Sequence, residues 1–503
     1  MRIEDHNSSS STKSRNCIRN VECTRKRLFV FCDGTWQDGV NNKRPLTNVT
    51  TLARSLEGVA DDNYLQVVYY DNGVGNATSL PAHLVDGATG RGISAKIRNA
   101  YSFLSHNYNF DDGEDEIFLI GFSRGAFTVQ CLASLISQTG LFHKRYLYYL
   151  RGLFTMWANH HFTPLLHPQS QPIQNILDEY VKMFESEKLL RKVKIKACVV
   201  WDTVSNLGLP RPWAKPMSFV GNVVPQAVEN AFQALALDET RAQFRPCIWK
   251  EKEDEDTFVK QCWFLGSHRD VGGNGDAALG AVTLIWMIAQ LQNISNVKFN
   301  QEEIKKHLKH RFLEWDIDMN RISGQVQQTA SLSRRPSSGQ TTRFSPLWWL
   351  SGFKRRTVDM MMNDDPDLDV TTSIHFTVRL SMFCNPNQCR VLRKWETVRN
   401  DGRIYWQKHD KKLIEDILEG SGDYEYAILK RWFSEEPPLL HTDRTMFAIR
   451  LQAMIYDSLE DRHGSLGQFA VFLRDKAIFN EENILAPGSM YLPRKTRFAV
   501  WLG

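Results

Sequence analysis

The segment Gly-Phe-Ser-Arg-Gly at 121–125 is the part of the sequence best suited to covalent chemistry. An apolar run, EIFLI, leads directly into it, and a helical pattern, AFTVQCLASLISQ, follows it. A strand, a tight turn and a helix around Gly-x-Ser-x-Gly form a nucleophile elbow, which exposes a serine hydroxyl above the sheet. The flanking Gly121 and Gly125 leave room for such a turn. We therefore predict that Ser123 is the nucleophile of a serine hydrolase; the alternative is a strand-to-helix turn in which Ser123 only caps the helix.

A serine nucleophile needs a base, and the base needs an acid that orients it. In α/β hydrolases these residues follow in the order serine, acid, histidine. Asp202 ends the apolar run VVWD, and His268 follows the run WFLGS, so both fit this order. Asp270 is an alternative acid, and His83, His106 and His375 are alternatives to His268 as the base. Without a catalytic role, Asp202 would cap a turn and His268 would lie in a surface loop.

The oxyanion of an acyl-transfer reaction needs two backbone N–H donors. The first is expected from Arg124, the residue after the nucleophile. The second is expected from the loop after the first strand, where Asp33-Gly34-Thr35 follows the run RLFVFC. Gly34 allows a close backbone approach, so Gly34 or Thr35 is the predicted second donor.

Short apolar runs alternate with helical patterns over the first 300 residues. Strands are expected from Arg27 onwards and at 65–70, 116–120, 193–201 and 260–265, and helices at 91–106, 126–138 and 277–292. This alternation predicts an α/β domain over 27–300, in which a doubly wound, mostly parallel sheet carries helices on both faces.

The rest of the chain is organised differently. Residues 1–26 are polar and serine-rich and are expected to be a disordered tail. Residues 324–343 are low in complexity and are predicted to be a flexible linker. The linker separates the α/β domain from an accessory C-terminal region of mixed character, 344–503.

Composition narrows the class of protein. The 503 residues carry 62 Lys and Arg against 57 Asp and Glu, and this net charge of +5 is too small to predict a nucleic-acid partner. The nine cysteines are scattered, which favours buried free thiols in a reducing compartment, and we expect no metal and no cofactor. The start of the chain has no apolar signal region, and no run is long enough to span a membrane. We expect a cytoplasmic protein with peripheral membrane contact as an option.

A membrane contact is suggested by the segment SPLWWLSGFKRR at 345–356. Its apolar residues are Trp348, Trp349, Leu350 and Phe353, and Lys354, Arg355 and Arg356 follow. Indole rings beside cations suit a lipid interface, with the charges on anionic lipid. The alternative is that the tryptophans pack the C-terminal region onto the first domain.

Six segments, in order, resemble the signatures of one family: RLFVFCDGTWQD, YYDNGVG, GFSRGAFT, VVWDTVSNLG, AFQALALDETRAQFRP and WFLGSHRDVGG. This is the uncharacterised α/β-hydrolase family related to the catalytic domain of type VI secretion phospholipase effectors. The resemblance covers about residues 27–295, with a weaker echo at 373–380.

The resemblance implies an esterase or phospholipase that forms an acyl-enzyme. Carried over motif by motif, the catalytic residues fall on Ser123, Asp202 and His268. The expected substrate is a carboxylic ester, either lipid or phospholipid. The alternative function is a catalytically inactive hydrolase fold that acts as a binding or scaffold protein.

Overall fold

The structure is a computed structural model of the whole chain. It describes the following residues: 25–34, 46–73, 91–111, 114–162, 171–204, 223–241, 244–250, 257–300, 302–304, 306–307, 356, 372–379, 389–400, 403–409 and 411–416. The predicted linker, the tryptophan-rich segment up to residue 355 and residues 1–24 of the predicted tail lie outside these ranges.

A ten-stranded sheet organises the described residues, in the order β10-β11-β12-β9-β8-β7-β6-β3-β1-β2. All neighbouring strands from β12 to β2 run parallel, and β10, β11 and β12 pair antiparallel. The strands are β1 (Lys26–Cys32), β2 (Leu65–Asp71), β3 (Glu116–Phe122), β6 (Ala197–Trp201), β7 (Asn230–Ala236), β8 (Phe258–Phe264), β9 (Thr372–His375), β10 (Glu396–Asn400), β11 (Arg403–Lys408) and β12 (Lys411–Asp416).

Strand β1 shows why the sheet is covered on both faces. Its residues from Leu28 to Phe31 are completely buried, as expected of a parallel strand with helices above and below. Phe29 and Phe31 pack in one hydrophobic core, whereas Leu28 and Val30 pack in a second core on the opposite face. The continuous apolar run in the sequence therefore serves two cores at once.

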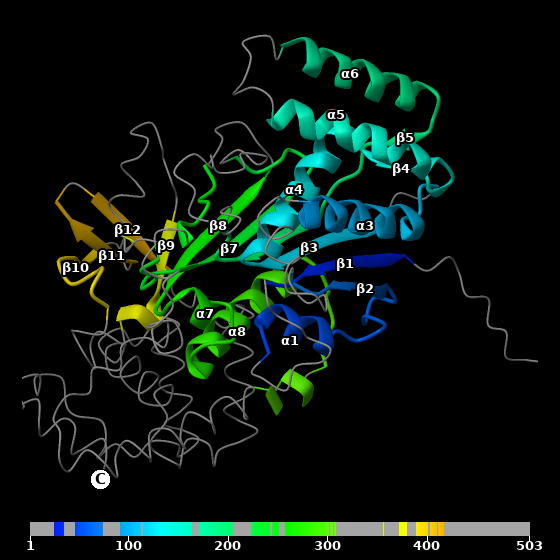
Figure 1. Cartoon of the computed structure of the whole chain (residues 1–503). Helices are drawn as coiled ribbons and strands as arrows, with labels where there is room; N and C mark the ends of the chain where they lie inside the picture. The colour runs from blue at the N-terminus through cyan, green and yellow to red at the C-terminus, as the bar shows by residue number, and fades with distance from the viewer. Residues whose placement is uncertain are drawn as a thin grey trace, which may run out of the picture.

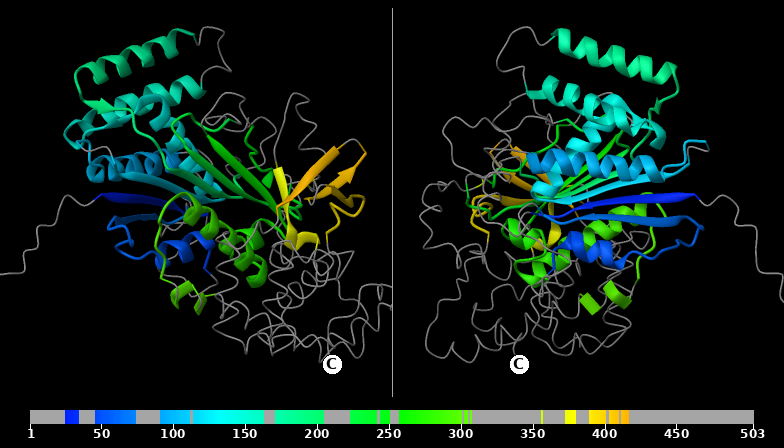
Figure 2. Two further views of the ribbon diagram at one scale, coloured as in Figure 1. Left: turned by 180° about the vertical axis from the view of Figure 1, so that it is seen from behind. Right: turned by 45° about the vertical axis from the view of Figure 1, so that its right-hand side comes forward.

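Helices cover both faces, as Figures 1 and 2 show. On one side lie α3 (Arg91–Asn107), α4 (Arg124–Thr139), the 3-10 helix η1 (Lys144–Tyr149), α5 (Leu150–Phe162) and α6 (Gln171–Ser186). On the other lie α1 (Asn48–Ser55), α7 (His268–Val271) and α8 (Ala277–Ile294). A separate two-stranded antiparallel sheet pairs β4 (Leu141–Phe142) with β5 (Leu190–Arg191), the two ends of the helical segment formed by η1, α5 and α6.

The chain reverses its direction of winding between β1 and β3. Strand β2 lies on one side of β1, and β3 and the following parallel strands lie on the other. In doubly wound sheets, ligands bind at the carboxyl ends of the strands beside this switch point. The elbow at 121–125 follows β3 and Asp33-Gly34 follows β1, so both predicted motifs lie at that position.

The predicted fold class is confirmed. The expected strands and the three expected helices of the first region are present, although β6 begins at Ala197 rather than at 193. Strand β7 was not expected. Its sequence, NAFQALA, has three alanines and few β-branched residues, and here tertiary burial outweighs local propensity. Strands β9 to β12 come from the C-terminal region and extend the same sheet.

Candidate active site

Ser123 lies on a sharp turn between β3 and α4. Its backbone has φ 58° and ψ −119°, a strained conformation for a non-glycine residue and one typical of a nucleophile elbow. The Ser123 N–H donates to the Trp201 carbonyl at 3.0 Å. A Cβ at Gly125 would overlap the Cys32 carbonyl oxygen, and one at Gly121 would lie 2.6 Å from the Ala126 nitrogen. Glycine is therefore required on both sides of the serine.

Asp202 comes directly after β6, the neighbour of β3. Its side chain is completely buried, and its backbone also has a positive φ of 44°. The Asp202 N–H donates to the Ala234 carbonyl at 2.8 Å, and Oδ1 accepts the Ala236 N–H at 3.0 Å. These bonds to β7 aim the carboxylate across the carboxyl end of the sheet.

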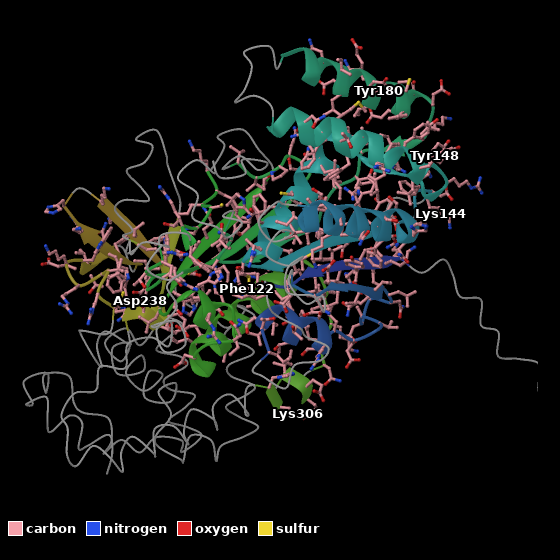
Figure 3. All side chains as sticks on the ribbon, in the orientation of Figure 1. Phe122, Lys144, Tyr148, Tyr180, Asp238 and Lys306 are labelled. Carbon is pink, nitrogen blue, oxygen red and sulfur yellow. The ribbon has the colours of Figure 1, made fainter. Side chains whose placement is uncertain are left out.

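His268 is the first residue of α7, and its loop is held by hydrogen bonds to Asp270. Asp270 Oδ2 accepts the N–H and the hydroxyl of Ser267, both at 2.7 Å, and its Oδ1 accepts the Asp276 N–H at 2.7 Å. The imidazole lies between two aromatic rings, with centroid distances of 4.7 Å to Phe122 and 4.8 Å to Phe244. Figure 3 places Phe122 near the middle of the molecule, away from Lys144 and Tyr148.

The three side chains form one hydrogen-bonded chain. Ser123 Oγ lies 2.8 Å from His268 Nε2, and His268 Nδ1 lies 2.6 Å from Asp202 Oδ2. Ser123 and His268 are only 6% and 4% exposed, so these bonds lie in a poorly hydrated environment. A neutral imidazole that donates from Nδ1 to the carboxylate presents Nε2 as an acceptor for the serine hydroxyl.

The charges at this site perturb one another. Burial lowers the pKa of His268, and the Asp202 hydrogen bond and negative charge oppose that shift. Burial raises the pKa of Asp202, but the positive charge of Arg356 and the bond to His268 outweigh it, so that the pKa lies well below its ordinary value. At neutral pH the arrangement is therefore a neutral imidazole beside an ionised carboxylate.

The other predicted acid and bases are placed elsewhere. The contacts of the Asp270 carboxylate given above are within its own loop, and the acid bonded to His268 is Asp202. The His106 ring contacts Ser102 on α3, and the buried His375 ring contacts Thr377 after β9. His83 lies outside the described residues.

The predicted oxyanion donors receive one correction. The Gly34 N–H donates to Asp33 Oδ1 at 2.7 Å, so it is occupied and does not supply the second donor in this conformation. Asp33 is buried and also accepts the hydroxyls of Thr47, Thr50 and Tyr70, which anchor the loop to α1 and β2. Arg124 begins α4, where the first N–H groups lack partners within the helix. Thr35 lies outside the described residues.

Arg356 is a site residue that the sequence interpretation placed wrongly. The sequence groups it with Lys354 and Arg355 as a cation for anionic lipid, but it is only 5% exposed and forms an ion pair with Asp202. A basic run beside tryptophans resembles a surface feature, and no local signal separates its third cation from the first two.

The fold and this arrangement together define an α/β-hydrolase-like protein with a serine, an imidazole and a carboxylate in series. Residues 26–290, more than half of the chain, match the family described as "T6SS, Phospholipase effector Tle1-like, catalytic domain". The chain belongs to this family, and the resemblance seen in the sequence is confirmed.

The individual relatives and solved structures share little sequence with this chain. The uncharacterized protein YEL023C of Saccharomyces cerevisiae is 26% identical over 233 residues, covering 44% of this chain and 32% of that protein. An uncharacterized protein from Pseudomonas aeruginosa is 14% identical with a TM-score of 0.32, covering 56% and 47% of the two chains. The Tle1 effector bound to the VgrG spike from the Type 6 secretion system is 16% identical with a TM-score of 0.28, covering 54% and 56%. This chain thus spans about a third of the curated relative and about half of each solved structure.

Three further observations bear on membrane insertion, metal binding and the state of the cysteines. Within the described ranges, no helix combines the length and the apolar character needed to cross a membrane. The same residues include no cluster of three or more His, Cys, Asp or Glu suited to a metal ion. The described cysteines are free thiols, and all but Cys247 are buried.

Proposed function

We propose that the protein is a serine esterase that hydrolyses carboxylic esters of lipids through an acyl-enzyme. The observation that supports this most is the continuous hydrogen-bonded chain from Ser123 Oγ through His268 to Asp202. The strained elbow, the buried carboxylate and the lipid-hydrolase family all agree with it. We assign Ser123 as nucleophile, His268 as general base and acid, and Asp202 as the residue that orients the imidazole.

The chemistry follows from the positions of the protons. Ser123 Oγ attacks the ester carbonyl carbon while His268 Nε2 accepts the hydroxyl proton. Asp202 Oδ2 stabilises the imidazolium through Nδ1–H, and the Arg124 N–H is placed to stabilise the oxyanion. His268 then protonates the departing alkoxide, which leaves an acyl group on Ser123. Water then attacks that ester as His268 Nε2 accepts one of its protons. His268 returns this proton to Ser123 Oγ as the bond between the acyl carbon and Oγ breaks, which releases the acid and restores the free hydroxyl.

The Arg124 side chain favours a substrate that carries negative charge near its ester. Its Cα lies one peptide unit, about 3.8 Å, from that of Ser123. Burial lowers the pKa of Arg124 to about 10, and no described carboxylate opposes that shift. Arg124 is half-buried, and a partly desolvated cation with no described counter-charge is stabilised when an anion accompanies it in the functional complex. A phosphodiester next to the scissile acyl ester, as in a glycerophospholipid, supplies such an anion.

Contact with a membrane is a separate part of the proposal. Trp348, Trp349, Leu350 and Phe353 remain its proposed anchor, and all four lie outside the described residues. Arg356 is excluded from that anchor because it is buried at the active site.

The first experiment compares wild type with Ser123→Ala on short p-nitrophenyl esters, on neutral acylglycerols and on anionic phospholipids. We expect the variant to lose ester hydrolysis by several orders of magnitude, and to lose labelling by a fluorophosphonate, while its thermal unfolding stays unchanged. Higher wild-type rates on phospholipid than on acylglycerol would support the anionic substrate. Labelling that persists in Ser123→Ala, or a folded wild type that hydrolyses none of the three classes, would contradict the proposal and favour a binding or scaffold role.

A further inference from the structure

Arg356 makes more contacts with the active site than a surface cation would. Its Nη1 donates to Asp202 Oδ1 at 2.6 Å, and its Nη2 donates to Asp202 Oδ2 at 2.9 Å, so the guanidinium holds both carboxylate oxygens. Nη1 also donates to the Ala236 carbonyl at 2.8 Å, and Nη2 donates to the Phe244 carbonyl. The Arg356 N–H donates to the Glu239 carbonyl at 3.3 Å. One buried side chain thus joins the ends of β6 and β7 to the segment that carries Phe244.

The contacts of Asp202 define what this arginine does to it. Oδ2 is shared between His268 Nδ1 and Arg356 Nη2, whereas Oδ1 accepts from Arg356 Nη1 and the Ala236 N–H. The planar guanidinium donates from two nitrogens to the two oxygens of the planar carboxylate. This paired contact fixes the rotation of the carboxylate, which a point charge would not do. In this position Oδ2 faces the imidazole. The guanidinium also places a positive charge beside the Asp202 carboxylate, which must itself stabilise the His268 imidazolium.

Arg356 lies outside residues 26–290, the range that matches the family. It comes from the C-terminal region, which in sequence is separated from the elbow by more than 200 residues. Among the described residues of the α/β domain, no Lys or Arg pairs with the buried Asp202 carboxylate, and an uncompensated buried charge is costly.

We propose that Arg356 is a positioning residue of the active site, through which the C-terminal region orients the Asp202 carboxylate toward His268 and offsets its charge. This inference rests on the proposed function, because it concerns the orienting acid of that reaction. The guanidinium touches neither Ser123 nor the substrate in this assignment, and it acts through Asp202 alone.

A pH profile separates this role from a purely structural one. The charged groups that face His268 are Asp202 after β6, Glu239 and Arg241 after β7, and, across Asp202, Arg356; Asp270 belongs to the histidine's own loop. Loss of the Arg356 charge leaves more net negative charge beside the imidazole. Protonation of His268 then becomes easier, and the acid limb of kcat/KM moves to higher pH.

The experiment uses the full chain and the variants Arg356→Met and Arg356→Lys, assayed on a soluble p-nitrophenyl ester. For Arg356→Met we expect kcat to fall about 10- to 100-fold with little change in KM, and the acid limb to rise by about one pH unit. For Arg356→Lys we expect a fall in kcat with an acid limb close to that of wild type, because lysine keeps the charge but not the fork. Arg27→Met, which removes an arginine of similar burial at the amino end of the sheet, is the matched control and should leave the acid limb in place.

A double-mutant cycle tests whether the effect passes through the acid. In an Asp202→Asn background, Arg356→Met should lower kcat much less than it does in wild type, because the group it orients is already neutral. An unchanged acid limb in folded Arg356→Met, or equal losses in both backgrounds, would overturn the inference. If Arg356→Met does not fold, Arg356→Lys decides: wild-type kcat in that variant would overturn it. Fluorophosphonate labelling of wild type shows independently whether the proposed function itself holds.

Discussion

The two ends of the parallel sheet each bury an arginine against carboxylates. At the amino end, Arg27 donates to Asp62 and to Glu116, and its side chain is 3% exposed. At the carboxyl end, Arg356 donates to Asp202, and its side chain is 4% exposed. The two arginines are thus matched in burial and in the bidentate geometry of their main ion pair.

Their partners differ. Asp62 and Glu116 are 27% and 21% exposed, and the Arg27 contacts with the Ser295 hydroxyl and the Asn296 carbonyl join the end of α8 to the sheet. Asp202 is fully buried and is shared between the arginine and the His268 imidazole. The partly exposed ion pairs of Arg27 stabilise the packing of α8 on the sheet. The ion pair of Arg356 and Asp202 is fully buried and contacts a titratable imidazole, which is the arrangement expected at a site of proton transfer.

The largest expected effect comes from removing the imidazole of His268, at the carboxyl end of the sheet. His268→Ala should lower kcat about as much as Ser123→Ala, because the serine loses its base. Asp202→Asn should be somewhat milder, since the acid only orients and stabilises the imidazolium. Asp62→Asn, the matched change at the amino end, should leave kcat near wild type. Steady-state kinetics on one soluble ester compares the three variants.

The comparison between the two ends would fail if Asp62→Asn impaired catalysis as strongly as Asp202→Asn does. Circular dichroism and thermal unfolding of each variant show whether a lost rate reflects the chemistry or the fold.

A smaller effect is expected from Arg27→Met. Removing the guanidinium leaves Asp62 and Glu116 without their cation, but their partial exposure lets water replace part of the interaction. We expect a loss of about 2 to 3 kcal/mol in the free energy of unfolding, after discounting for that exposure. The midpoint of thermal unfolding should fall by several degrees while the pH profile of the folded enzyme stays in place. A midpoint equal to that of wild type would show that Arg27 does not fasten α8 to the sheet.

The smallest expected effect is the position of the acid limb in wild type itself. Burial lowers the pKa of His268 from an ordinary value of 6.5, so its neutral, basic form persists below that pH. Activity should therefore decline only when the pH falls below 6.5, and the Asp202 carboxylate, with its lowered pKa, stays ionised there. Between the unfolded and folded pKa values the unfolded chain binds more protons, so this histidine also costs stability as the pH falls. A pH series of kcat/KM places the limb, and a limb above 6.5 would contradict this account.

Much of the fold can be predicted from the sequence because buried parallel strands are continuous apolar runs. Strands β1, β3 and β6 are of this kind, and the strong period of α3 and the apolar α4 and α8 identify the helices. Strand β7 shows the limit of the method. Its alanine-rich sequence has no strong strand propensity, and it becomes a strand because β6 and β8 pair with both of its edges.

The same division applies to the site. The sequence by itself determined the elbow around Ser123 and the chain order of Asp202 and His268, because glycine spacing and strand ends are local properties. Only the tertiary structure decided which acid meets the histidine, with Asp270 held in its own loop and Asp202 at 2.6 Å. It alone also decided that Gly34 donates to Asp33 and that Arg356 lies beside Asp202 rather than at the surface. These contacts join residues that are close only after the sheet forms. A charged side chain can be buried only where the folded chain places an opposite charge or a hydrogen-bond partner beside it.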